Sequence, residues 1–288
     1  MANALSYIAS ETRQHDRDRF LCSLFAPEET RESLFTVLAF NIEISKTREM
    51  VRESLLGEIR LQWWRDSIEL IYNNSSGVNS DHLVVRELAK VIEKFKLSRA
   101  LFDQLIDSRS RDLVDVPFND EVDLRRYAYG TSSTLCNILL EILCPAISTL
   151  SRDEISAAES VGMAWALTGI VRASASLAKQ KRMFIPKTLF EEFGFNNNEF
   201  YAQNATDGIL KATSYIVDLA RIEIAYARNL LKGKVKRRYV ALLLQASLAE
   251  LYLNKIESLG FNPFSPKIES GRGWRQLKIS FMAARGSF

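Results

Sequence analysis

Residues 162–186 read GMAWALTGIVRASASLAKQKRMFIP, and this stretch is the most informative part of the 288-residue chain for its fold and its chemistry. Its first half is small and apolar, which suits either close helix packing or the lining of an apolar cavity. From residue 160 to residue 190 there is no Asp or Glu, whereas five basic residues are present: Arg172, Lys179, Lys181, Arg182 and Lys187. The segment can therefore bind an anion, but it cannot by itself hold a divalent cation.

The apolar spacing on both sides of this stretch is helical. The proline-free ranges 28–116 and 187–262 carry apolar stripes at intervals of three and four residues, and the alternation typical of strands is hard to find. One stripe is Leu34, Val37, Leu38, Asn41 and Ile42, and another is Tyr215, Leu219, Ile222, Tyr226 and Leu230. Six prolines and twelve glycines are also too few for a turn-rich barrel or sandwich. We therefore predict an all-α protein.

Local signals mark several helix ends. Pro27 followed by two glutamates predicts a helix start, and Ser151 with Glu154 forms a predicted capping box. Further expected boundaries are a loop at residues 73–77 and helix stops at Gly194 and Gly260.

Composition excludes several classes of protein. A balance of 38 Lys and Arg against 35 Asp and Glu gives a net charge of +3, too small to indicate general nucleic-acid binding. Three cysteines without CxxC spacing, and two distant histidines at 15 and 82, indicate neither a disulfide framework nor a metal site. The polar N-terminus resembles neither a secretory signal nor a mitochondrial presequence, and no apolar run approaches the roughly 20 residues of a membrane span. These features favour a bacterial cytosolic protein or a processed mature chain that does not cross a membrane.

The stretch at 162–186 also resembles the second signature of squalene and phytoene synthases. Arg172 matches the signature arginine, Arg182 the later basic residue, and residues 184–186 the closing aromatic-X-Pro ending. The positions that carry the acidic residues in that signature are instead Ala173, Ser176 and Leu177. In the first signature, after Ala39 and Phe40, Ser45 and Glu49 stand where two aspartates belong.

The resemblance covers about residues 20–259 and implies an all-α, single-domain isoprenoid-synthase-type helical bundle around a central cavity. We expect one domain over 1–288, with a family core at about 20–260 and a basic, less regular tail at 261–288. In active members of the family two aspartate motifs hold Mg²⁺ ions that bind prenyl diphosphates, so the substitutions predict a protein without catalysis, cofactor or metal.

Four further phrases resemble one branch of the family, that of the mitochondrial complex I assembly factor and its bacterial relatives. They are AFNIE at 39–43, GEIRLQWW at 57–64, IELIY at 68–72 and LLEIL at 139–143. This resemblance implies an assembly or scaffold factor for respiratory NADH dehydrogenase, with complex I subunits or assembly proteins as partners. It places the protein in the cytoplasm, peripheral to the inner membrane, or on the matrix side if the chain is organellar.

Two alternatives remain open at this point. The protein is an active head-to-head prenyltransferase with Mg²⁺ if Asp103, Asp107 and Asp112 face the cavity, or else a prenyl-lipid-binding protein without turnover. For binding, the expected positive mouth is made by Arg172, Lys179, Lys181 and Arg182, unless these side chains point into water. The expected apolar lining is Phe40, Trp63, Tyr129 and Trp165, each of which is also an ordinary core residue.

A local basic surface is expected outside the family core. The phrase KGKVKRR at 232–238 puts five bases into seven positions, and the tail adds Lys267, Arg272, Arg275, Lys278 and Arg285. Such a surface favours contact with an anionic membrane, or is simply a solvated helix end. Few aromatic residues are interleaved with these bases, so we expect no nucleic-acid partner.

Overall fold

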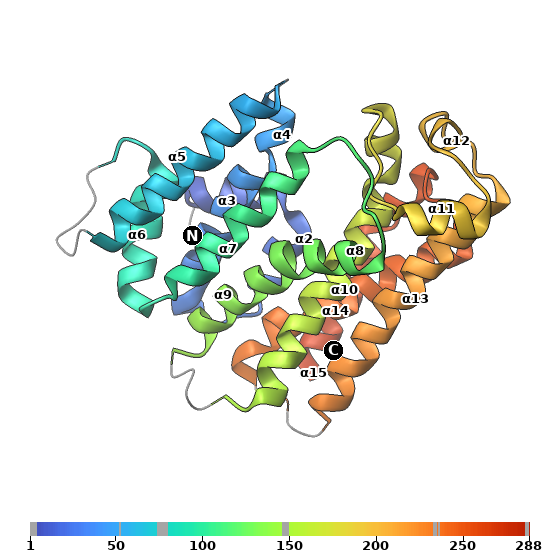
Figure 1. Cartoon of the computed structure of the whole chain (residues 1–288). Helices are drawn as coiled ribbons and strands as arrows, with labels where there is room; N and C mark the ends of the chain where they lie inside the picture. Colours follow the sequence, from blue (N-terminus) through green and yellow to red (C-terminus); the bar gives the residue numbers. More distant parts are fainter. Residues whose placement is uncertain are drawn as a thin grey trace.

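The computed structural model describes residues 5–51, 53–73, 80–145, 150–232, 235, 237–285 and 288. Within these ranges every regular element is a helix, which confirms the all-α prediction (Figure 1). The α-helices are α1 (Tyr7–His15), α2 (Arg17–Ser23), α3 (Glu28–Ser45), α4 (Thr47–Met50), α5 (Ser54–Asn73), α6 (Leu83–Phe95), α7 (Arg99–Arg109), α8 (Glu121–Ala128), α9 (Thr134–Leu143), α10 (Arg152–Lys179), α11 (Lys187–Phe193), α12 (Asn197–Tyr201), α13 (Asp207–Leu230), α14 (Val240–Ser258) and α15 (Arg272–Arg285). Shorter turns are the 3₁₀ segments η1 (Ser110–Leu113), η4 (Arg237–Tyr239) and η5 (Pro266–Glu269), and the π-helical η2 (Tyr129–Ser133).

The local boundary signals act as the sequence predicts. Pro27 precedes α3, whose first turn carries two glutamates, and Ser151 and Glu154 form a reciprocal capping box at the start of α10. Gly194 ends α11 and Gly260 follows α14, both at positive φ, where a Cβ would be strained. The predicted loop at 73–77 begins at the last residue of α5, and its other residues lie outside the described ranges.

Helix α10 is the centre of the bundle. It packs against α9, α13, α14 and η2, and most of its residues from Ala157 to Val171 are buried. Gly162 permits the closest approach, because a Cβ at this position would lie 2.5 Å from the Ser133 Cα of η2. By length and composition α10 is also long and apolar enough to span a membrane, but 67% of its most apolar stretch is buried inside the bundle. Burial of this kind is what the core helix of a bundle shows.

The two predicted apolar stripes have different outcomes. The stripe of α3 is buried, and one of its neighbours, Phe40, packs fully buried against Trp64 and Phe102. The stripe assigned to α13 is wrong in part, since Ile222 is 58% and Tyr226 50% exposed. The face of α13 that packs inward holds Ile209, Ala212, Ile216, Val217, Ala220, Ile224 and Ala227. Both faces are apolar, so only contact with α10 determines which one is buried.

The C-terminal segment is more regular than predicted. After the turn at Gly260 the chain forms η5 and then the 14-residue helix α15, which packs on α14. The expectation of a less regular tail is therefore wrong, because Ile268 and Ile279 are buried and tie these two elements to the bundle. In Figure 1 the C-terminus lies beside α14 and α15, at the base of the same bundle.

Candidate functional site

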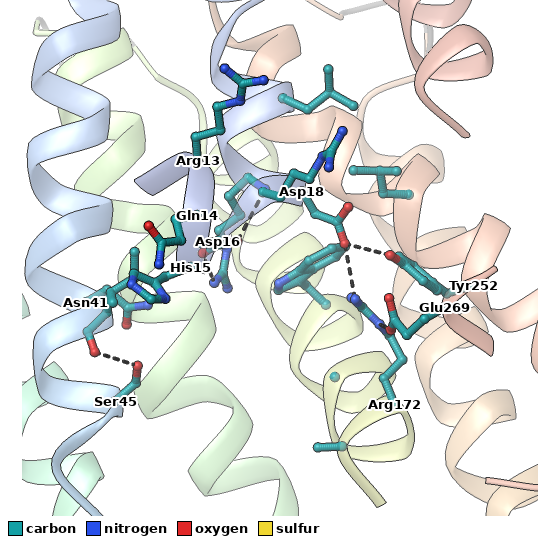
Figure 2. Close-up of a pocket in the computed structure, with 18 of the residues that line it drawn as sticks. Arg13, Gln14, His15, Asp16, Asp18, Asn41, Ser45, Arg172, Tyr252 and Glu269 are labelled. Atoms are coloured by element: carbon teal, nitrogen blue, oxygen red, sulfur yellow. Dashed lines mark hydrogen bonds and ion pairs between the residues drawn. The ribbon is translucent and has the colours of Figure 1, made fainter. Parts of the chain in front are cut away.

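A cavity of about 760 Å³ lies between the α1–α2 corner, α3, α10, α14 and the η5–α15 segment (Figure 2). Charged side chains dominate its wall. The arginines that line it are Arg13, Arg17, Arg19, Arg109, Arg172 and Arg275, and the carboxylates are Asp16, Asp18 and Glu269. The cavity therefore has an excess of basic groups, and an anion is the kind of ligand that suits its charge.

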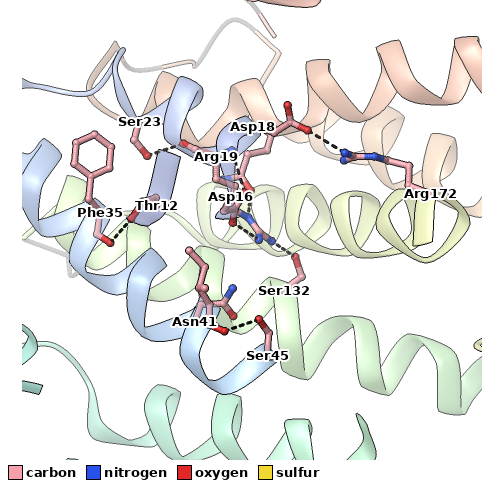
Figure 3. Close-up of polar contacts among 12 residues, drawn as sticks. Thr12, Asp16, Asp18, Arg19, Ser23, Phe35, Asn41, Ser45, Ser132 and Arg172 are labelled. Atoms are coloured by element: carbon pink, nitrogen blue, oxygen red, sulfur yellow. Dashed lines mark hydrogen bonds and ion pairs between the residues drawn. The ribbon is translucent and has the colours of Figure 1, made fainter. Parts of the chain in front are cut away.

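Arg172 is the hub of one polar network on the cavity wall (Figures 2 and 3). Its guanidinium lies 3.2 Å from the Asp18 carboxylate, 2.9 Å from Glu269 and 3.6 Å above the ring of Tyr252. The Tyr252 hydroxyl donates to Asp18 at 2.8 Å. Burial alone would lower the pKa of Arg172, but Tyr252, Asp18 and Glu269 outweigh it and raise that pKa, so the side chain stays charged.

Arg19 is the hub of a second network on the cavity wall. Asp16 caps the start of α2 and pairs with Arg19 at 3.0 Å, as Figure 3 shows. The same guanidinium donates to Gln245 at 3.0 Å and to Ser132 at 3.1 Å. The guanidinium carbons of Arg19 and Arg172 lie 5.5 and 5.6 Å from the Trp165 ring, so this indole contacts both networks.

A smaller apolar chamber of about 220 Å³ adjoins the charged cavity. The two share walls at Arg19, Arg109, Trp165, Gly169 and Ala173. The remaining lining of the smaller chamber is Tyr127, Thr131, Ser132, Ala166, Ile170, Leu177 and Phe184. Together the two spaces suit a molecule with an anionic end and an apolar end.

Of the four predicted anion-binding residues, the structure brings only Arg172 to the cavity. Lys179 and Lys181 are exposed and do not line it. Arg182 is buried, donates to the Asp112 carbonyl at 2.5 Å and lies 3.2 Å from the Asp115 carboxylate. The expected group of four bases is thus wrong, because α10 ends at Lys179 and the chain turns before Arg182.

The predicted apolar lining is also confirmed only in part. Trp165 lines both chambers. Phe40 instead belongs to the core between α3, α5 and α7, and Trp63 is half-exposed on α5. Tyr129 lines neither chamber; its hydroxyl donates to Glu159 at 2.8 Å, and burial followed by this bond raises its pKa to about 12.

The degenerate motif positions do not form a Mg²⁺ site. Ser45 lines the cavity but bonds back to the Ile42 carbonyl at 3.0 Å, and Glu49 is exposed on the separate helix α4. Ala173 and Leu177 present methyl groups to the chambers, and Ser176 is exposed.

The carboxylates that do line the cavity are engaged by arginines rather than available to a cation. Across the described ranges no three His, Cys, Asp or Glu side chains are grouped so that they could hold a metal ion. The residues therefore do not fit the magnesium ions of the active family members.

The alternative carboxylates also lie elsewhere. Asp103 pairs with Arg99 at 3.3 Å and Asp107 with Arg65 at 2.8 Å, both on the outer surface of α7. Asp112 is buried, but it accepts from the Tyr127 hydroxyl at 2.6 Å and pairs with Arg109 at 3.2 Å. None of the three acids lines the cavity, so the condition set for the prenyltransferase alternative is not met.

Two parts of the cavity wall were not predicted from the sequence. One is the corner RQHDRDR at 13–19, which alternates bases and acids just before the expected family core. The other is the pair Glu269 and Arg275 in the tail that was expected to be irregular. The dense alternation of bases and acids at 13–19 was the available signal, although such alternation is also typical of a solvent-exposed helix face.

Comparison with known proteins agrees with this architecture. The sequence model of the squalene/phytoene synthase family matches residues 12–282. This chain belongs to the squalene/phytoene synthase family. The match includes both the arginine-rich corner at 13–19 and most of α15.

One relative and two solved structures show where in the family the similarity lies. The human protein "NADH dehydrogenase (ubiquinone) complex I, assembly factor 6" is 28% identical over 264 residues, covering 91% of this chain and 77% of its own. Squalene synthase HpnC from Alicyclobacillus acidocaldarius superposes with a TM-score of 0.76 at 21% identity, over 89% of this chain and 94% of its own. A dehydrosqualene synthase gives a TM-score of 0.80 at 18% identity, over 97% and 94%. The two structures establish the isoprenoid-synthase-type fold.

Proposed function

We propose that this protein is a non-catalytic assembly factor for respiratory NADH dehydrogenase, acting at the face of the inner membrane. The cavity carries this proposal. Its wall holds carboxylates that are paired with arginines, and no carboxylate cluster able to bind magnesium is found among the described residues. The similarity to a complex I assembly factor over 91% of the chain supports the same conclusion.

Prenyl transfer of this kind depends on stabilising the diphosphate leaving group. Ionising an allylic diphosphate separates a carbocation from a multiply charged anion, and metal ions supply much of the stabilisation of that charge. In this cavity Asp18 and Glu269 already neutralise Arg172, and Asp16 neutralises Arg19. The carboxylates of this wall are thus paired with arginines instead of being free to bind a metal ion, and we expect no head-to-head condensation.

Two measurements test the proposal. Purified protein is incubated with farnesyl or geranylgeranyl diphosphate, with Mg²⁺ or Mn²⁺ and with or without NADPH, and product is separated by chromatography. We expect no squalene or phytoene above an Arg172→Ala control; metal-dependent product would refute the loss of catalysis. Deletion of the gene should lower the assembled NADH dehydrogenase in native gels of membranes, and unchanged assembly would refute the assembly role.

An assembly factor also needs a surface for its protein partner, and α5 supplies one. Its outer face exposes a row of large apolar side chains: Leu55, Leu56, Ile59, Trp63 and Leu70. The charges along this helix are mixed, with Glu58, Asp66 and Glu69 beside Arg60 and Arg65, and the acids disfavour an anionic membrane as the occupant. We therefore assign this face to a subunit or assembly protein of complex I.

A second candidate function is supported by the shape of the two joined chambers. The basic cavity and its apolar extension suit an anionic amphiphile, either a prenyl diphosphate or an anionic lipid, held without turnover. Arg13 and Arg17 are exposed at the mouth, so Arg13→Gln with Arg17→Gln should weaken binding about ten-fold or more.

The test is titration calorimetry with farnesyl diphosphate, inorganic pyrophosphate and phosphatidylglycerol micelles, all in EDTA. Tighter binding of farnesyl diphosphate than of pyrophosphate supports the apolar chamber as part of the site. Binding that appears only when Mg²⁺ is added would contradict direct recognition by arginine.

A further inference from the structure

Helix α15 has two faces of opposite character. Arg275 and Ile279 are buried against the bundle, where the Arg275 guanidinium lies 4.3 Å from the Tyr252 ring and donates to the Glu269 carbonyl. On the outer side Trp274, Leu277 and Phe281 are 69%, 68% and 56% exposed. At 100° per residue these three side chains fall within an arc of about 60°, so they form one apolar ridge.

The charges that α15 places beside this ridge have one sign. No Asp or Glu follows Glu269 in the sequence, whereas Lys278 and Arg285 lie next to the ridge on the same exposed side of α15. The Arg285 guanidinium lies 4.3 Å from the Phe281 ring, so the basic flank is in direct contact with the apolar ridge. The outer face of α15 therefore combines an apolar ridge containing tryptophan with a basic flank.

We propose that α15 is a docking helix that lies in the surface of an anionic lipid bilayer, with Trp274, Leu277 and Phe281 inserted and Lys278 and Arg285 at the head groups. A tryptophan ring beside apolar and basic residues is the composition of interfacial helices. Helix α15 contains no acidic residue. In α5, by contrast, acids lie beside the exposed apolar side chains, and that face suits a protein partner.

Docking through α15 has a consequence for the cavity. Arg275 and Gln276 of this helix line the charged cavity, and Glu269, just before it, pairs with Arg172. A bilayer held at α15 therefore lies next to one wall of the cavity. The inference deepens the peripheral membrane location of the proposed function by naming the surface responsible.

The first experiment is sedimentation of the purified full chain with vesicles of phosphatidylcholine alone or with 30% phosphatidylglycerol. The triple variant Trp274→Ser, Leu277→Ser and Phe281→Ser should lose binding to anionic vesicles about ten-fold or more. A matched control changes two equally exposed apolar residues of α13, Ile222→Ser with Tyr226→Ser, and should stay within about two-fold of the parent. Lys278→Glu with Arg285→Glu should also lower binding, and high salt should lower it for the parent.

The second experiment locates the inserted side chain by tryptophan fluorescence. Anionic vesicles should shift the emission to shorter wavelength, and Trp274→Phe should abolish the shift whereas Trp63→Phe should retain it. The proposal is overturned by equal binding to neutral vesicles, by an unaffected triple variant, or by a shift that depends on Trp63. These experiments use only purified protein and lipid, so a negative result does not contradict the complex I assembly role. Failure of the assembly test, in turn, does not contradict membrane docking through α15.

Discussion

Replacing Arg172 by methionine tests the polar network that forms the cavity wall. The substitution keeps most of the aliphatic stem of the side chain but removes the guanidinium. That group lies 2.9 Å from Glu269, 3.2 Å from Asp18 and 3.6 Å from the centre of the Tyr252 ring. Without it, the two carboxylates lose the cation that they share in a partly buried wall.

The expected cost follows from these distances. A hydrogen bond to a charged group contributes about 1.5 to 3 kcal/mol, and a cation over an aromatic ring about 1 kcal/mol. Water offsets part of the loss, because the side chains of Asp18 and Glu269 are 22% and 40% exposed. We therefore expect Arg172→Met to lower the free energy of unfolding by about 2 to 3 kcal/mol.

Urea unfolding at pH 7, followed by circular dichroism, measures this change. Arg172→Lys keeps the positive charge but not the planar fork, so it should cost about half as much. Lys211→Met serves as control, since Lys211 forms a comparably short pair with Asp207, 2.7 Å, whose two side chains are 60% and 81% exposed. The control should change the free energy of unfolding by less than about 0.5 kcal/mol.

The reasoning is refuted if Arg172→Met unfolds within about 0.5 kcal/mol of the parent protein. The same holds if lysine and methionine at this position cost the same, because the charge would then contribute nothing. A loss equal to that of the Lys211 control would show that the cavity network behaves like an ordinary surface ion pair.

Three further predictions concern other parts of the molecule. Gly162→Ala should lower the free energy of unfolding, measured with heat or urea, by about 2 kcal/mol or more, because the new Cβ would lie 2.5 Å from the η2 backbone. Gly169→Ala should instead stabilise α10 by up to about 1 kcal/mol, because no atom lies within 4 Å of the new Cβ. Glu250→Gln should lower the free energy of unfolding by about 0.5 to 1 kcal/mol at pH 7. Hydrogen bonding to Arg228 lowers the pKa of Glu250, so the stability from this pair is present above the unfolded pKa of about 4.3. The difference in unfolding free energy between variant and parent should therefore disappear as the pH falls below that value. Ile59→Asp should leave unfolding unchanged but lower complex I assembly at least two-fold on native gels, whereas Val122→Asp on α8 should not; equal assembly with both would contradict a partner site on α5.

Predictions that depend on neighbouring residues along the chain succeeded for a physical reason. The capping box at Ser151 and the turns at Gly194 and Gly260 depend on hydrogen bonds and dihedral angles within one turn of helix. The chemistry of two signature positions was also readable, because Ala173 and Leu177 have no side-chain oxygen atom to offer a cation, whichever way they point.

Predictions about which way a side chain points succeeded less often. Lys179, Lys181 and Arg182 follow Arg172 closely in sequence, yet two are exposed and the third is buried against Asp112. The α13 stripe failed similarly, since that helix is apolar on two faces and the packing partner selects one of them.

By itself, the sequence determined the helical class, several helix ends and the residue types that stand at the family signature positions. Each of these depends on the residue type and on spacings of a few positions. Only the tertiary structure determined that the corner at 13–19, Arg172 and the segment from Glu269 to Arg275 form one cavity. These segments are up to about 260 residues apart, and their meeting depends on how the buried faces of α3, α10 and α14 pack, which no local spacing specifies.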